Sequence, residues 1–263
     1  MCIRDRYCDS LEARAARETF SVADGEEPNP VSASDLAELS AHLLDGVEGL
    51  HSISVTGGEP LEQPEFLASF LPRCRSFGVP LYLETNGLHP EAAASVFPLV
   101  DIISLDIKLP SLCRGGDLLA VYEEVLPLAR GVDAFCKIVA AEGMDRGEFG
   151  RAVDLIARHD RWMPLVIQPA TPVAGCGSVE PGLIDGLYRE AAGRLANAYI
   201  VLLVDHGEML ADHGFYNKGE FHYDACIRVP LVIAGPNVVA GQVRGELVQL
   251  EDVFPTVLDM AGL

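Results

Sequence analysis

The chain has 263 residues, 49% of them apolar, and a formal net charge of −20 with an isoelectric point near 4.6. Such acidity argues against nucleic acids and anionic membranes as partners, because both attract clustered lysine and arginine. No apolar stretch approaches the roughly 18 residues that suggest a membrane span. The seven cysteines are scattered and form no CxxC pair, which favours a reducing compartment. We therefore expect a cytoplasmic protein with no nucleic-acid or membrane partner.

Most of the sequence alternates short apolar runs with longer amphipathic stretches. Residues 11–33 are polar and acidic, with a glycine and two prolines, and are expected to form a loop. Ser34 is expected to cap the first helix. The alternation indicates βα units around a parallel sheet, and so an α/β fold. The predicted helices are 35–44, 65–76, 90–97, 117–128, 146–158, 182–195 and 253–261, and the predicted strands are 53–55, 80–83, 102–105, 135–140, 165–167, 199–204 and 229–234.

Polar motifs follow several of the predicted strands. A Gly-Gly turn after a strand is most often only a turn, although it also lets a ligand approach the backbone closely. Polar residues at several strand ends together predict the mouth of a site, because functional groups of parallel sheets gather there. The motifs are Thr56-Gly57-Gly58-Glu59-Pro60, Glu84-Thr85-Asn86-Gly87, Asp106-Ile107-Lys108 and Gln168-Pro169.

Together with Tyr7-Cys8-Asp9-Ser10, these motifs resemble the radical SAM superfamily, and most closely its 7-carboxy-7-deazaguanine synthase-like branch. The resemblance runs from about residue 8 to 193. It implies a partial βα barrel with a [4Fe–4S] cluster that reductively cleaves S-adenosylmethionine (SAM). It further implies a small heterocyclic substrate, a role in queuosine biosynthesis and a reductase or flavodoxin partner. Residue by residue, it implies a cluster ligand at Cys8, a magnesium contact at Ser10, a substrate contact at Thr56, and cofactor contacts at Gly57, Gly58, Glu59, Asp106, Lys108 and Gln168.

The chain departs from the family pattern before Cys8. The other two cluster cysteines would fall at Asp5 and Met1, and the spacing of Cys2 does not fit. We therefore expect that a [4Fe–4S] cluster does not assemble stably and that the chain is inactive as a radical enzyme, because such clusters are held by several thiolates. Residues 1–7 are interpreted as non-native, and the first barrel strand is expected to be missing.

A second set of polar residues follows the strand predicted at 199–204. Asp205 and His206 stand at its end, where a carboxylate and an imidazole can bind a divalent cation. A simple polar turn is the alternative. Lys218 could bind an anionic group, although an isolated lysine is more often solvated.

The wider pattern at 205–214, 217–219, 228–233, 235–236 and 252–262 resembles sulfatases of the alkaline-phosphatase-like superfamily. That resemblance implies calcium ligands at Asp205 and His206 and a sulfate contact at Lys218. The family's nucleophile lies in a C/S-x-P-x-R motif, which is absent here. We therefore expect no hydrolysis of sulfate esters.

The two resemblances divide the chain into a radical SAM-like domain at 8–195 and a sulfatase-like fragment at 196–263. A chimeric or misassembled reading frame explains both incomplete sites, with the join between about 190 and 200. Three functional classes stay open: a radical SAM enzyme fragment, a calcium-dependent sulfatase fragment, and a non-catalytic α/β binding module. The strand of the second segment is expected to add to the first sheet or to lie beside it.

Overall fold

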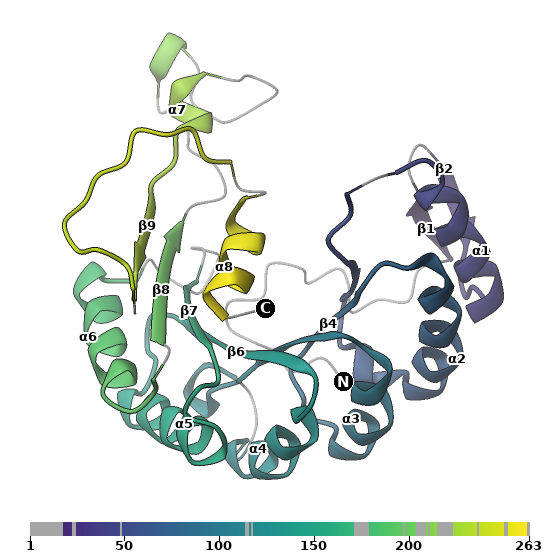
Figure 1. Ribbon diagram of the computed structural model, residues 1–263, viewed down its shortest axis with the longest axis horizontal. Helices are drawn as coiled ribbons and strands as arrows, with labels where there is room; N and C mark the ends of the chain where they lie inside the picture. Colours follow the sequence, from purple (N-terminus) through teal and green to yellow (C-terminus); the bar gives the residue numbers. More distant parts are fainter. Residues whose placement is uncertain are drawn as a thin grey trace.

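Six parallel strands and one antiparallel strand form the main sheet of the protein (Figure 1). The computed structural model describes residues 18–22, 25–47, 49–113, 116, 118–170, 179–196, 198–203, 209, 211–214, 223–235, 237–249 and 252–261. The strands of the main sheet lie side by side in chain order: β3 (Ile53–Val55), β4 (Leu81–Thr85), β5 (Ile102–Asp106), β6 (Asp133–Ala140), β7 (Leu165–Pro169), β8 (Ala198–Leu203) and β9 (Leu231–Ala234).

Helices α1 to α6 cover the convex side of the curved sheet, whereas α7 is drawn at the top, away from the sheet, and α8 is drawn inside the arc (Figure 1). The predicted α/β fold with a parallel sheet is therefore confirmed. No described helix is long and apolar enough to cross a membrane. The helices are α1 (Ala33–Leu44), α2 (Pro64–Cys74), α3 (Pro90–Val96), α4 (Leu119–Val125), α5 (Arg146–His159), α6 (Pro181–Ala192), α7 (Asp224–Ile227) and α8 (Val253–Ala261).

Two local predictions near the start of the described chain are wrong. A small antiparallel hairpin, β1 (Thr19–Val22) with β2 (Gly25–Pro28), occupies part of the predicted loop. The polar sequence hides this hairpin because neither strand has a buried face. The cap of α1 is Ser32 rather than Ser34, since the Ser32 hydroxyl accepts a hydrogen bond from Asp35 N at 3.1 Å.

The main sheet has two chemically different faces. Successive side chains of a strand point to opposite faces, and in β4 to β7 one set is buried with the helices in a single apolar cluster. This set includes Leu83, Leu105, Ile138 and Ile167. The alternate positions therefore face the concave side, and they include Tyr82, Glu84, Ser104, Asp106, Lys137 and Gln168.

The segment after residue 197 extends this sheet. Strand β8 pairs in parallel with β7, with Ala198 opposite Leu165, and β9 then pairs with β8 in antiparallel. This confirms the expectation that the strand of the second segment adds to the sheet. Among the described residues, the last buried member of the main apolar cluster is Leu195. The segment thus shares backbone hydrogen bonds with the sheet more than it shares the core.

Gly87 lets the chain turn directly beneath the carboxyl end of β4. Its φ of +65° is left-handed, and a Cβ atom there would lie 2.5 Å from Leu105 Cδ1 and 3.1 Å from Val125 Cγ1. Gly87→Ala should therefore lower the free energy of unfolding by about 1–2 kcal/mol through backbone strain and by a further ~1–3 kcal/mol through overpacking. Urea denaturation measures the sum.

Gly78→Ala is the matched control, because Gly78 has a φ of +69° with no atom within 4 Å of the added Cβ. This variant should show the backbone cost alone. Equal destabilisation by the two substitutions would contradict close packing beneath β4.

Candidate functional site

Polar side chains from four neighbouring strands meet at the carboxyl edge of the sheet. The loop after β3 supplies Thr56, β4 supplies Glu84, β5 ends at Asp106, and β6 supplies Lys137. The parallel register sets Asp106 directly opposite Lys137 and Glu84 opposite Ser104. Because these positions share the concave face, their side chains can contact one another across the strands.

The loop after β3 presents its backbone to solvent. Gly57 has a φ of +134°, a region that L side chains rarely adopt, and no atom lies within 4 Å of the position that a Cβ would take. Thr56, Gly57 and Gly58 are all exposed. The loop therefore leaves its backbone open, and the contact of its peptide groups with a ligand stays a prediction.

Glu59 holds this loop to the end of β4. Its side chain is buried, and its Oε1 accepts hydrogen bonds from Leu61 N at 3.0 Å and from the Thr85 hydroxyl. Its Oε2 accepts a hydrogen bond from Asn86 N at 2.9 Å. Both oxygens therefore bind groups of the protein itself, so the observed role of Glu59 is to fix the loop. A direct contact with a cofactor stays a prediction.

A chain of polar contacts crosses the site from the loop after β3 to β6, and its charged members alternate in sign. Thr56 Oγ1 donates to Glu84 Oε2 at 3.3 Å, and Lys137 Nζ lies 2.5 Å from Glu84 Oε1. Lys137 Nζ also lies 3.7 Å from Asp106 Oδ2, which accepts a hydrogen bond from Lys108 Nζ at 2.7 Å. Two carboxylates and two ammonium groups thus balance one another, as partly buried charges require.

Asp106 retains an unused acceptor within this network. Its Oδ1 is buried and has no hydrogen-bond partner among the described residues, whereas its Oδ2 is engaged by lysine. Buried polar atoms are nearly always paired with protein, water or a bound group, so this exception at the edge of a parallel sheet marks a candidate binding position. The free atom is suited to an N–H or O–H donor.

Tyr122 of α4 fixes the backbone beside this carboxylate. Its hydroxyl accepts a hydrogen bond from Lys108 N at 2.8 Å and donates one to Asp106 O at 3.3 Å. The side chain is fully buried, and burial holds the pKa of the hydroxyl well above its usual value, so the proton stays in place. Sequence reasoning missed Tyr122, because it reads as an ordinary apolar position of a helix.

Lys137 is the second residue that the sequence analysis missed. It is the charged residue in the apolar run from Ala134 to Ala141. A lysine inside a buried strand is rarely tolerated without a partner, and this rule could have identified it.

The other predicted site residues divide into one that is described and five that are not. Gln168 lies exposed on β7, and no described hydrogen bond joins it to the charge network. Its predicted contact with a cofactor is therefore untested. The predictions for Cys8, Ser10, Asp205, His206 and Lys218 fall outside the described residues.

The described residues fit SAM better than they fit an iron–sulfur cluster. SAM has an ammonium and a carboxylate group, and the site offers a free Asp106 oxygen, a lysine and open peptide groups. The described cysteines are buried instead, and burial raises the pKa of the Cys74 and Cys136 thiols, which disfavours thiolates. No group of three potential metal ligands occurs in the described part of the chain.

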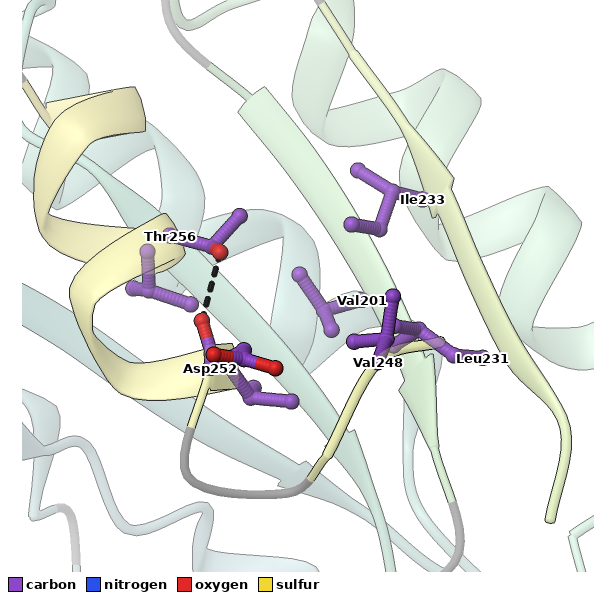
Figure 2. A pocket seen from close by; sticks show the side chains of 8 residues that line it. Val201, Leu231, Ile233, Val248, Asp252 and Thr256 are labelled. Atoms are coloured by element: carbon purple, nitrogen blue, oxygen red, sulfur yellow. Dashed lines mark hydrogen bonds between the residues drawn. The ribbon is translucent and has the colours of Figure 1, made fainter. Parts of the chain in front are cut away.

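A pocket in the sulfatase-like segment is apolar rather than catalytic in character (Figure 2). It lies between strands β8 and β9 on one side and α8 on the other. Its polar members are already satisfied within the chain, since Thr256 Oγ1 donates to the Asp252 carbonyl and Asp252 Oδ2 accepts from Gln249 N. It is therefore a packing seam, lined by Val201, Leu231, Ile233, Val248, Asp252, Val253, Thr256 and Val257.

Two comparisons with known proteins relate the C-terminal part to sulfatases. The sulfatase family model matches residues 182–263, beginning inside α6. The extracellular sulfatase SULF-1 homolog of Drosophila melanogaster is 38% identical over 82 residues, which are 30% of this chain and 7% of that protein. The chain thus spans only a small part of this relative.

Most of the chain is similar to another family. The 7-carboxy-7-deazaguanine synthase of Geobacter sulfurreducens is 36% identical over 206 residues, covering 74% of this chain and 80% of that protein. A solved structure of TYW1 with a lysine-pyruvate adduct bound has a TM-score of 0.51 at 12% identity, over 76% of this chain and 72% of that one, and shows likeness of fold. The chain belongs to the 7-carboxy-7-deazaguanine synthase family of radical SAM proteins, and its C-terminal segment is similar to sulfatases.

Proposed function

We propose that the carboxyl edge of β3 to β6 is a SAM-binding site, inherited from an enzyme that starts radical chemistry on a small heterocycle. The single observation that supports this most is the unpaired, buried Asp106 Oδ1 beside two lysines. Membership of the synthase family supports the identity of the ligand.

The chain's own residues would hold SAM by its charged groups. Asp106 Oδ1 would accept a hydrogen bond from the ligand's ammonium group, and Lys108 would attract its carboxylate. The peptide group of Gly57 would approach the ligand where no atom stands in the way of the backbone, and the exposed Gly58 would follow it. Thr56, which Glu84 orients, would contact the heterocyclic substrate.

We propose further that this chain binds SAM without cleaving it. The family's reductive chemistry comes from a [4Fe–4S] cluster held by several thiolates. Cys8 is the one cysteine with matching sequence context, and Asp5 and Met1 occupy the other two positions. On this proposal the chain therefore carries out no reductive cleavage. It is then a radical SAM enzyme fragment that acts as a non-catalytic binding module.

Asp106→Asn should weaken SAM binding by about 10- to 100-fold, because a charged hydrogen bond contributes about 1.5–3 kcal/mol. Isothermal titration calorimetry measures the dissociation constant, and thermal unfolding checks that the variant folds. Glu123→Gln is the control, since Glu123 is an exposed carboxylate that pairs with Arg158 on the convex side. Unchanged affinity in Asp106→Asn would contradict the assigned role of this carboxylate.

Anaerobic iron–sulfur reconstitution tests the incomplete cluster. The expected result is far fewer than the about four irons per chain of a complete cluster, with no 5′-deoxyadenosine formed from SAM and dithionite. Iron analysis and chromatography give the two readouts. Near-stoichiometric iron together with SAM cleavage would show a competent radical enzyme.

The sulfatase family match favours a second function for the C-terminal segment. We propose that Asp205 and His206 bind calcium and that Lys218 binds an anionic oxygen, following the sequence resemblance. Carboxylate oxygens are hard ligands that suit calcium. No cysteine or serine of this chain stands in a C/S-x-P-x-R motif, so no nucleophile is available for ester hydrolysis.

Asp205→Ala should weaken calcium binding by at least about tenfold, the equivalent of ~1.4 kcal/mol, because one charged ligand is lost. Calorimetry with calcium chloride provides the measurement. Asp212→Ala serves as control, since Asp212 is an exposed aspartate that pairs with His213. Equal calcium binding by the parent chain and Asp205→Ala would rule out this site.

A further inference from the structure

Lys137 of β6 is a charged residue within the apolar run from Ala134 to Ala141. Its neighbours in the strand, Cys136 and Ile138, are fully buried on the helix-covered side. Lys137 therefore faces the concave side, where its side chain is 16% exposed. A lysine so enclosed loses hydration, which its partners must replace.

Both partners of Lys137 are acidic and come from different strands. Its Nζ lies 2.5 Å from Glu84 Oε1 on β4 and 3.7 Å from Asp106 Oδ2 on β5. Lys108, by contrast, is paired with Asp106 through Oδ2 at 2.7 Å. Lys137 is thus the cation that links the two carboxylates, and its loss would leave two negative charges with one positive charge.

Lys137 and Lys108 together hold one oxygen of the Asp106 carboxylate, with Lys108 the nearer at 2.7 Å and Lys137 at 3.7 Å. The two ammonium groups both lie on the Oδ2 side, and Oδ1 has no partner. A carboxylate that lost one of these cations could rotate about its terminal torsion, which is soft. Lys137 therefore adds to Lys108 in holding the plane of the Asp106 carboxylate with one oxygen unpaired.

We propose that Lys137 is a positioning residue that sets the affinity of the site for the ammonium group of a zwitterionic ligand through Asp106, without touching the ligand. This inference rests on the proposed SAM site and deepens it. A purely structural lysine would affect all ligands of the site to a similar degree. A positioning lysine affects only ligands that carry the amino-acid group.

Two ligands separate these roles: SAM, and 5′-methylthioadenosine, which keeps the adenosine and the methylated sulfur but lacks the ammonium and carboxylate groups and the positive charge of the sulfonium. Lys137→Met should weaken SAM binding by about tenfold and change 5′-methylthioadenosine binding by less than about twofold. Lys137→Arg keeps the charge and should restore SAM affinity to within about threefold of the parent chain. Lys137→Gln replaces Lys137→Met if the latter does not fold.

The result that overturns the inference is parent-like SAM affinity in both uncharged variants, or an equal loss for both ligands. In either case the parent chain still binds SAM, and the proposed function stands. A parent chain that binds no SAM would instead overturn the proposed function and this inference together. Calorimetry on folded variants, checked by thermal unfolding, provides all of these readouts.

Discussion

The parallel register between β5 and β6 is the constraint on which the site depends. It sets Asp106 opposite Lys137 on the concave face, while Leu105 and Ile138 enter the apolar cluster beneath the helices. A slip of one residue would exchange these faces, burying the charges among apolar side chains and exposing the core. The burial of the convex face therefore fixes the position of the charges, and site geometry follows from the hydrophobic pattern of the strands.

The charge network then explains how ionised side chains are stabilised beside a largely apolar core. Ionised groups are costly to remove from water unless they are paired. Glu84, Lys137, Asp106 and Lys108 alternate in sign, and Tyr122 fixes the backbone at the end of β5. One acceptor, Asp106 Oδ1, is left over. Pairing thus stabilises the site, and the unpaired atom is the acceptor that the proposal assigns to a ligand.

The main sheet contains strands from the part similar to 7-carboxy-7-deazaguanine synthases and from the part similar to sulfatases. Strand β8 pairs with β7 through its backbone, although the buried cluster ends at Leu195 among the described residues. Parallel pairing is made by backbone groups, so a strand can extend the edge of a sheet with few demands on its side chains. The part that the sulfatase family matches also reaches the core, because Leu187, Ala191 and Leu195 of the apolar cluster lie within residues 182–263. The seam between β8, β9 and α8 gives the added segment apolar contacts of its own.

The alternation of strands and helices, and the motifs at strand ends, were predictable because both are local patterns. The role of Tyr122 was not predictable, because its partners come from another element, and the polar β1–β2 hairpin lacks a hydrophobic signal. Lys137 could be singled out as a charge in an apolar run, but its partner Glu84 on another strand could not. The most direct test of the central claim is a crystal structure of the chain soaked with SAM. We expect the ligand between Gly57 and Asp106, with its ammonium nitrogen in hydrogen-bond contact with Asp106 Oδ1. Ligand density elsewhere, or none at saturating SAM, would contradict the account.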